Sequence, residues 1–152
     1  MGRVLDEMKA FFDSDDWNTT ELEEVPNVLR MGFRGDDAEW RCYAQANEQR
    51  EIFLFYSVAQ LKVPDGRRVA VAEFLTRANY GMLIGNFEMD VNDGEVRFKT
   101  SVDVEGTTLG LPLARRIVYA NVMTMDRYLG GIMGVAFGGL EPREAIARIE
   151  MT

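Results

Sequence analysis

Apolar residues at the start of the chain recur with the period of an α-helix. They are separated by three or four positions: Val4, Leu5, Met8, Phe11 and Phe12. This spacing places their side chains on one face, and it predicts an amphipathic helix over residues 3–14. The acidic segment that follows, with Pro26 near its end, predicts a solvated connector over residues 13–26, with a divalent-metal cluster as the alternative.

From Asn27 the period of the pattern changes to two. Leu29, Met31 and Phe33 alternate with other residues, and after a turn at residues 35–37 the same alternation returns at Trp40, Cys42 and Ala44. Alternation of this kind predicts β-strands with one buried face. The next segment, residues 52–61, is apolar on both faces, so we expect a strand that is covered on both sides.

Residues 88–99, EMDVNDGEVRFK, fit a β-hairpin better than a calcium-binding loop. An EF-hand loop that began at Asp90 would need glycine at its sixth position, where the chain has Glu95. With Asp93-Gly94 as a two-residue turn, Glu88 faces Lys99 and Asp90 faces Arg97 across the strands. The sequence therefore predicts a hairpin with an apolar face and a charged face.

Three more helices are predicted in the C-terminal part of the chain. Apolar positions from Val71 to Met82 have helical spacing, and Pro112 suits the first turn of the next helix. Glycines between 130 and 139 interrupt that helix, and Glu141-Pro142 begins a short final one.

The helix after Pro112 carries two apolar stripes, so it requires cover on more than one side. A sheet covers one side, and either another element of the same chain or a second chain covers the other. We favour a homodimer because few other helices are available. The predicted interaction surface combines one stripe with two residues of the doubly apolar strand: Val118, Val122, Met125, Leu129, Ile132, Phe53 and Phe55.

The whole pattern predicts a single α+β domain over residues 1–152. Its elements follow the order α-β-β-β-α-β-β-α(-α), with an antiparallel five-stranded sheet. A chain of 152 residues is long enough to bury a single core.

Charge and composition restrict the classes of partner. The net charge of −8 argues against nucleic acid and against anionic membrane surfaces. Cys42 is the only cysteine, so no intrachain disulfide forms, and no secretory signal or long apolar run is visible. We expect a soluble cytoplasmic protein.

Residues suited to catalysis are few. The chain has no histidine, which removes the commonest general base and metal ligand, and no cofactor-binding motif is present. Cys42 alternates with buried positions and is expected to be an inert thiol. Carboxylates remain: Asp126, Asp103, Glu105, Glu73, Glu88 and Asp90. Asp126 lies among apolar residues, where an ion pair or a helix-end contact is the favoured interpretation.

Several short segments in about the C-terminal half of the chain form a recognisable set: residues 79–80, 84–90 (IGNFEMD), 94–97 (GEVR), 126–128 (DRY), 138–139, Pro142 and 144–146 (EAI). Together they resemble the bacterial YbjN domain family. Members, sometimes labelled sensory transduction regulators, are similar to type III secretion chaperones in fold. The resemblance implies a cytoplasmic α+β domain that dimerises and has no known enzymatic activity, and it supplies no catalytic residues.

The leading hypothesis is a non-enzymatic interaction module, chaperone-like or regulatory, that acts as a homodimer and binds a protein or peptide segment. A small-ligand sensor is the alternative, with a pocket lined by Tyr128, Met125 and Phe98. A carboxylate-based hydrolase that depends on Asp126 ranks last.

Overall fold

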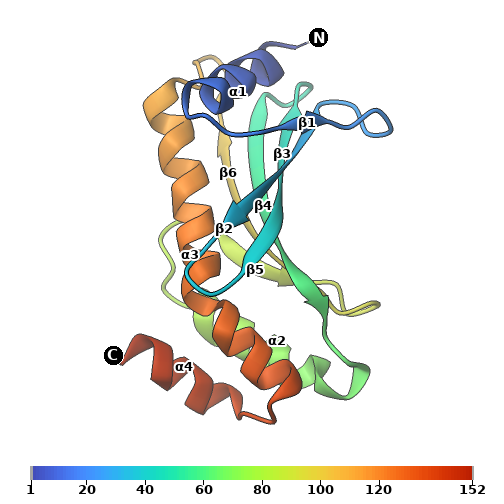
Figure 1. Cartoon of the computed structure of the whole chain (residues 1–152). Helices are drawn as coiled ribbons and strands as arrows, with labels where there is room; N and C mark the ends of the chain where they lie inside the picture. The colour runs from blue at the N-terminus through green and yellow to red at the C-terminus, as the bar shows by residue number, and fades with distance from the viewer. Residues whose placement is uncertain (1, 152) are drawn as a thin grey trace.

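The computed structural model describes residues 2–151 and contains one antiparallel sheet with helices on one side of it (Figure 1). The helices are α1 (Arg3–Ser14), α2 (Arg68–Asn79), α3 (Leu111–Phe137) and α4 (Pro142–Glu150), with a short 3-10 helix, η1 (Asp65–Arg67), before α2. The strands are β1 (Thr20–Glu21), β2 (Val28–Arg34), β3 (Glu39–Asn47), β4 (Ile52–Lys62), β5 (Asn86–Met89) and β6 (Glu95–Asp103). The α+β fold and the predicted order of elements are confirmed.

The sheet has six strands in the order β1-β2-β3-β4-β6-β5, one more than predicted. The extra strand is β1, which lies within the segment predicted to be a connector. Thr20 and Glu21 pair with Arg30 and Leu29 of β2. Such a short strand has no apolar alternation of its own, and only its pairing with β2 defines it.

Helix α1 forms over the residues that its apolar spacing predicts. Its buried side packs against β3, β4 and α3, and the rings of Phe12 and Phe55 lie 6.0 Å apart. Glu48, in the β3–β4 turn, accepts hydrogen bonds from the backbone N–H groups of Val4 and Leu5 at 3.1 and 2.8 Å. This distant carboxylate therefore caps the start of the helix.

Helix α3 continues through three of the glycines that were expected to interrupt it, and it ends at Phe137. A Cβ on Gly131 would lie 2.6 Å from the ring of Phe74 on α2 and 2.7 Å from Ile149 on α4. The glycine thus allows three helices to approach closely. The prediction of an interruption was wrong because this glycine is a packing contact inside the helix.

The hairpin of β5 and β6 is present, but its predicted register was wrong by two residues. Glu88 faces Arg97, and Met89 faces Val96. Only Gly94 in the turn has a positive φ (82°), whereas the predicted turn needs two such residues. Instead, Gly94 N–H donates to Asp90 O (2.7 Å), and Val63 N–H donates to Gly94 O (2.9 Å). The register thus depends on a longer loop and on a contact with the end of β4.

One polar side chain of α3 is inserted into the apolar core. Asn121 is fully buried, and its Nδ2 donates hydrogen bonds to Phe55 O (2.8 Å) and Phe98 O (3.0 Å) on β4 and β6. Thr100 Oγ1 lies 3.2 Å from the same nitrogen. The amide therefore joins the helix to the backbone of two neighbouring strands.

The outer face of the sheet, opposite α1 and α3, is not covered by any element within residues 2–151. Outward side chains of β4 such as Leu54, Tyr56 and Val58 are only partly buried there. The expectation that both faces of β4 are covered is therefore wrong for the single chain, because only the face toward the helices is covered.

None of the helices in the described part of the chain combines the length and the apolar character of a membrane span.

Candidate functional site

The outer half of β2 is an open strand edge. β1 pairs only with Leu29 and Arg30, and residues 17–19 before it form no strand. Residues 31–34, called the open edge below, therefore have a neighbouring strand on one side only within residues 2–151.

Backbone groups of the open edge point away from the sheet. Leu22 N–H donates to Val28 O, so Val28 points toward β1, and alternate residues of an antiparallel strand share that direction. The N–H and C=O groups of Gly32 and Arg34 consequently face outward, where no strand of the described chain pairs with them. Such groups form hydrogen bonds with an added strand.

Two hollows lie on either side of the open edge and share Gly32, Phe33 and Arg34 in their walls. The inner hollow, of about 480 Å³, lies on the helix side. The outer hollow, of about 500 Å³, lies on the uncovered side, and Arg41 and Gln60 contribute to it. An extended segment that pairs with the open edge would direct alternate side chains into the two hollows.

The inner hollow has an aromatic floor. The rings of Trp17 and Phe33 stack at 5.8 Å, and Tyr119 lies edge-on to Trp17 at 6.1 Å. Asp15 accepts hydrogen bonds from the Tyr119 hydroxyl (2.6 Å) and from Trp17 Nε1 (2.9 Å). These contacts hold the aromatic side chains of the floor in one arrangement.

Electrostatics keep the Asp15 carboxylate ionised. The hydrogen bond from Tyr119 is the main cause that lowers the pKa of Asp15, and Trp17 and Arg115 lower it further. Burial, and then Asp15 itself, raises the pKa of Tyr119. The Asp15 carboxylate thus holds Trp17 and Tyr119 in place, and both of its oxygens already accept hydrogen bonds.

Asp126 holds the turn that ends the open edge. Its Oδ1 accepts a hydrogen bond from Asp36 N–H at 3.0 Å, and a Cβ on Gly35 would overlap its carboxylate. Asp126 was predicted to make an ion pair or a helix-end contact, but it positions the β2–β3 turn instead. This engaged carboxylate gives no support to the predicted hydrolase.

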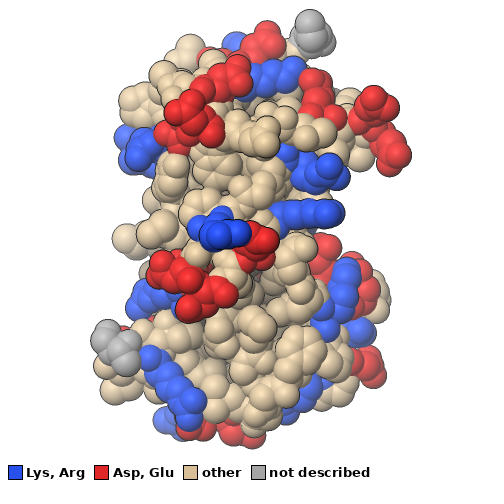
Figure 2. All heavy atoms as spheres, in the orientation of Figure 1, with Lys and Arg blue, Asp and Glu red and all other residues tan. Residues whose placement is uncertain are grey.

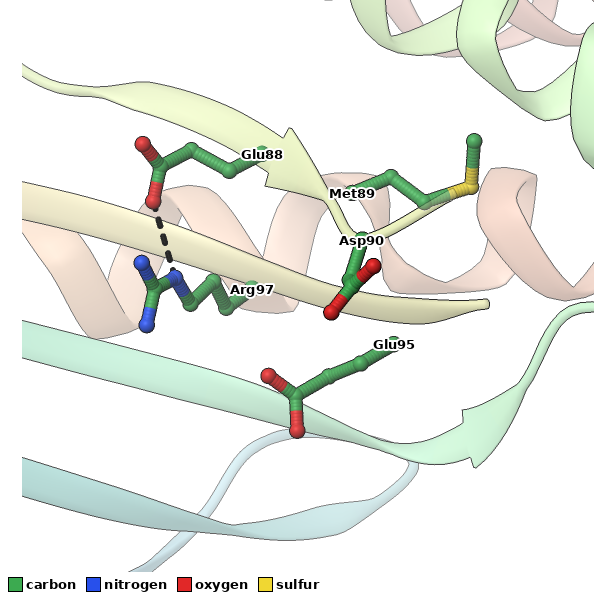
Figure 3. Close-up of a pocket in the computed structure, with 5 residues that line it drawn as sticks. All are labelled: Glu88, Met89, Asp90, Glu95 and Arg97. Atoms are coloured by element: carbon green, nitrogen blue, oxygen red, sulfur yellow. Dashed lines mark hydrogen bonds and ion pairs between the residues drawn. The ribbon is translucent and has the colours of Figure 1, made fainter. Parts of the chain in front are cut away.

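A further hollow, of about 260 Å³, lies on the outer side of β5 and β6 and contains part of the segment that was compared with a calcium loop. Figure 3 shows Glu88 directed at Arg97. Arg97 Nε donates to Glu88 Oε1 at 2.8 Å, and Lys99 Nζ donates to Glu88 Oε2 at 3.2 Å. Although partial burial raises the pKa of Glu88, these two cations lower it on balance. No group of three or more Cys, Asp or Glu within residues 2–151 is arranged to hold a metal ion.

The structure corrects the predicted interaction surface. Its seven residues are all in the core of a single chain: Val118, Val122, Met125, Leu129, Ile132, Phe53 and Phe55. The sheet covers one stripe of α3, and α1, α2 and α4 pack around the rest. The helix is apolar on two sides because elements of its own chain cover both stripes.

The predicted ligand pocket is filled by protein. Met125, Phe98 and Tyr128 are buried, and the ring of Phe87 lies 4.7 Å from Phe98 and 5.7 Å from Tyr128. Cys42 is also fully buried, and burial raises the pKa of its thiol to about 12. The predicted burial of this thiol is thereby confirmed, and a raised pKa disfavours the reactive thiolate.

Sequence reasoning missed the open edge and its hollows. The site consists largely of backbone groups, which no residue type identifies. One signal was available: Arg30, Gly32 and Arg34 occupy the outward positions of β2, and charged residues and glycine are typical of edge strands.

Comparisons with known proteins agree with the fold. The YbjN family model, described as "Putative bacterial sensory transduction regulator", matches residues 5–130. The fold is similar to that of E. coli YbjN, whose structure is described as that of "a putative transcription regulator", with a TM-score of 0.60 and 14% identity over 80% of this chain and 85% of that chain. It is also similar to a chain of the HopA1-SchA chaperone-effector complex, with a TM-score of 0.50 and 17% identity over 80% of this chain and 88% of that chain. A search of curated protein sequences finds no match.

Proposed function

Because the chain belongs to the YbjN family, we propose that it is a non-enzymatic protein-interaction module, chaperone-like or regulatory, which acts as a homodimer and binds an extended segment of a protein partner. The observation that carries the proposal is the open edge of β2. The similarity in fold to a chain of a chaperone-effector complex supports the same class of function.

Binding by strand addition explains the features of this edge together. The outward N–H and C=O groups of Gly32 and Arg34 supply main-chain hydrogen bonds, and the two hollows receive alternate side chains of the added segment. The backbone contacts give affinity, and the hollows give selectivity. The inner hollow, with Trp17, Phe33 and Tyr119, suits an apolar or aromatic side chain.

The self-contact of the proposed dimer needs a different surface from the one that the sequence predicted. Besides Leu111 at its first position, α3 exposes three large apolar residues: Met123, Met133 and Phe137. Gly130 lies among them on the same side of the helix, and nothing in the described chain approaches within 4 Å of the position of its Cβ. We assign the self-contact to this strip, which is apolar and allows a close approach.

A library of random linear peptides, selected against the wild-type chain, tests the proposed binding. Selected peptides are expected to slow hydrogen exchange at Gly32 and Arg34. Gly32→Pro removes one outward donor at an edge position that tolerates proline, so it is expected to abolish binding. Gly32→Ala keeps the N–H group and is expected to bind normally.

The proposal fails if no peptide is selected, if bound peptides protect other amides, or if Gly32→Pro binds as wild type does. Circular dichroism of both variants controls for folding. Light scattering after size-exclusion chromatography tests the dimer separately, and Met123→Glu is expected to convert it to a monomer. A monomeric wild-type chain at all concentrations would refute the self-contact.

A further inference from the structure

The outer face of the sheet carries local positive charge although the whole chain has a net charge of −8. Acidic side chains gather instead at the end of the molecule that carries α1 and β1 (Figure 2). We define the cationic face as Arg30, Arg41, Tyr43, Tyr56, Arg97 and Lys99.

Strand register brings these residues together. Arg30 faces Tyr43, Tyr43 faces Tyr56, and Tyr56 faces Lys99 across four neighbouring strands. In the next row, Arg41 faces Val58, and Val58 faces Arg97. Directly facing residues lie on the same side of a sheet, so the two rows form one continuous patch.

Two cations of this patch are not neutralised by the chain. Arg30 and Arg41 make no side-chain hydrogen bond or ion pair with any residue from 2 to 151. Arg97 and Lys99, by contrast, share the carboxylate of Glu88, and Asp90 and Glu95 line the same hollow as Arg97. The excess of positive charge therefore lies at Arg30 and Arg41.

We propose that the cationic face binds acidic side chains of the same extended segment that pairs with the open edge, and this inference rests on the proposed function. Arg41 belongs both to the cationic face and to the wall of the outer hollow, where Arg34 is paired with Glu39 and Arg41 is the cation without a partner among residues 2–151. Side chains that an added strand directs to the outer side thus enter positive surroundings. The partner segment alternates apolar residues, which enter the inner hollow, with Asp or Glu, which lie over the cationic face.

An acidic protein segment fits this face better than a nucleic acid does. The guanidinium of Arg97 lies 4.3 Å from the ring centroid of Tyr56, so it occupies the surface on which a base would stack. Four cations are also few compared with the phosphate contacts of nucleic-acid-binding proteins. The acidic end of the molecule repels a long polyanion.

Two fluorescein-labelled peptides test the inference. Both have the same alternating apolar residues, and the positions between them are all Glu in one peptide and all Gln in the other. Fluorescence anisotropy measures their binding to the wild-type chain and to Arg30→Gln/Arg41→Gln. The matched control, Arg116→Gln/Arg143→Gln, changes the net charge equally at two exposed arginines of α3 and α4.

The Glu peptide is expected to bind the wild-type chain and the control pair equally well. It should bind Arg30→Gln/Arg41→Gln about two- to thirtyfold more weakly, which is the range for two lost exposed ion pairs. The difference should shrink as the salt concentration rises. The Gln peptide should bind all three proteins alike.

Other results overturn the inference in distinguishable ways. If both peptides bind all the proteins equally and only Gly32→Pro abolishes binding, the open edge is correct and the cationic face is not used. If neither peptide binds the wild-type chain and library selection also fails, the proposed function is wrong as well. Tighter binding of a single-stranded oligouridine that depends on Arg30 and Arg41 would assign the face to nucleic acid. Loss of the dimer in the double variant would assign it to a second copy of the chain.

Discussion

Replacing Asn121 by Asp should destabilise the protein more than removing the side chain does. The Nδ2 atom of Asn121 donates to two carbonyl oxygens in a fully buried site. In Asn121→Asp an oxygen takes the place of that donor, and it faces the two carbonyl oxygens. Both hydrogen bonds are lost, at a cost of about 1 kcal/mol each.

The carboxyl group adds a cost that depends on pH. Full burial raises the pKa of a carboxyl group by about 3 units or more, and each unit corresponds to about 1.4 kcal/mol. The added cost at pH 7 is therefore about 4 kcal/mol. The total of about 6 kcal/mol is comparable to the whole stability of many domains, about 5 to 15 kcal/mol.

The sign of the pH dependence follows from the raised pKa. Below the ordinary pKa of Asp, about 4, the group is protonated in both the folded and the unfolded chain and adds no cost. As the pH rises, the unfolded chain ionises first, so Asn121→Asp loses stability between about pH 4 and pH 7. Asn121→Ala loses only the hydrogen bonds and the packing, and its deficit relative to wild type should not change with pH.

Urea unfolding of the three proteins, followed by circular dichroism at several pH values, measures these differences. The reasoning is refuted if Asn121→Asp is as stable as Asn121→Ala at pH 7, or if the difference between them does not grow as the pH rises. An alanine variant as stable as wild type would show that the buried amide does not secure α3 to the sheet.

Three further outcomes are expected. Gly35→Ala should lower the free energy of unfolding by about 1 to 3 kcal/mol, because its methyl group overlaps a carboxylate of α3; Gly66→Ala, which has open space, should not, and equal melting temperatures would contradict this account. Cys42 should react with a thiol reagent at pH 8 only after denaturation, because burial raises its pKa to about 12; fast labelling of the native chain would disprove its inertness. Tyr119→Phe should cost about 1 kcal/mol at pH 7. Tyr119 lowers the pKa of Asp15, so the ionised carboxylate stabilises the fold above the ordinary carboxyl pKa. The stability lost in Tyr119→Phe should therefore become smaller as the pH falls below about 4. Denaturant titrations measure it, and a loss that does not change with pH would exclude the carboxylate as the cause.

Most elements of the fold could be predicted because they depend on local periodicity. The helix over residues 3–14 and the strand over residues 52–61 follow directly from the spacing of apolar residues. The hairpin register could not be predicted, because it depends on the contact between Gly94 and Val63 at the end of another strand. Likewise, the role of Gly131 depends on Phe74, a residue of a different helix.

The candidate site was harder to predict than the fold. Apolar character indicates burial but does not show what provides it, so Val122 and Met125 were assigned to a partner although their own chain covers them. The open edge could not be found from side-chain types, because its hydrogen-bonding groups are the backbone N–H and C=O groups of Gly32 and Arg34. Their availability follows from the short length of β1, which only the three-dimensional pairing defines.

The placement of α1 has a consequence for synthesis on the ribosome. The helix is completed first, but it packs beside α3, and Arg3 donates to Val104 O, a residue 101 positions later. At about 5 to 20 residues per second, β4, whose Phe55 packs against Phe12, follows roughly 2 to 9 s after the helix, and the part of the cover beyond Val104 follows roughly 5 to 20 s after it. Until then part of the apolar face that contains Phe11 and Phe12 has no cover, and Asp13, Asp15 and Asp16 beside it place charge next to an aggregation-prone segment.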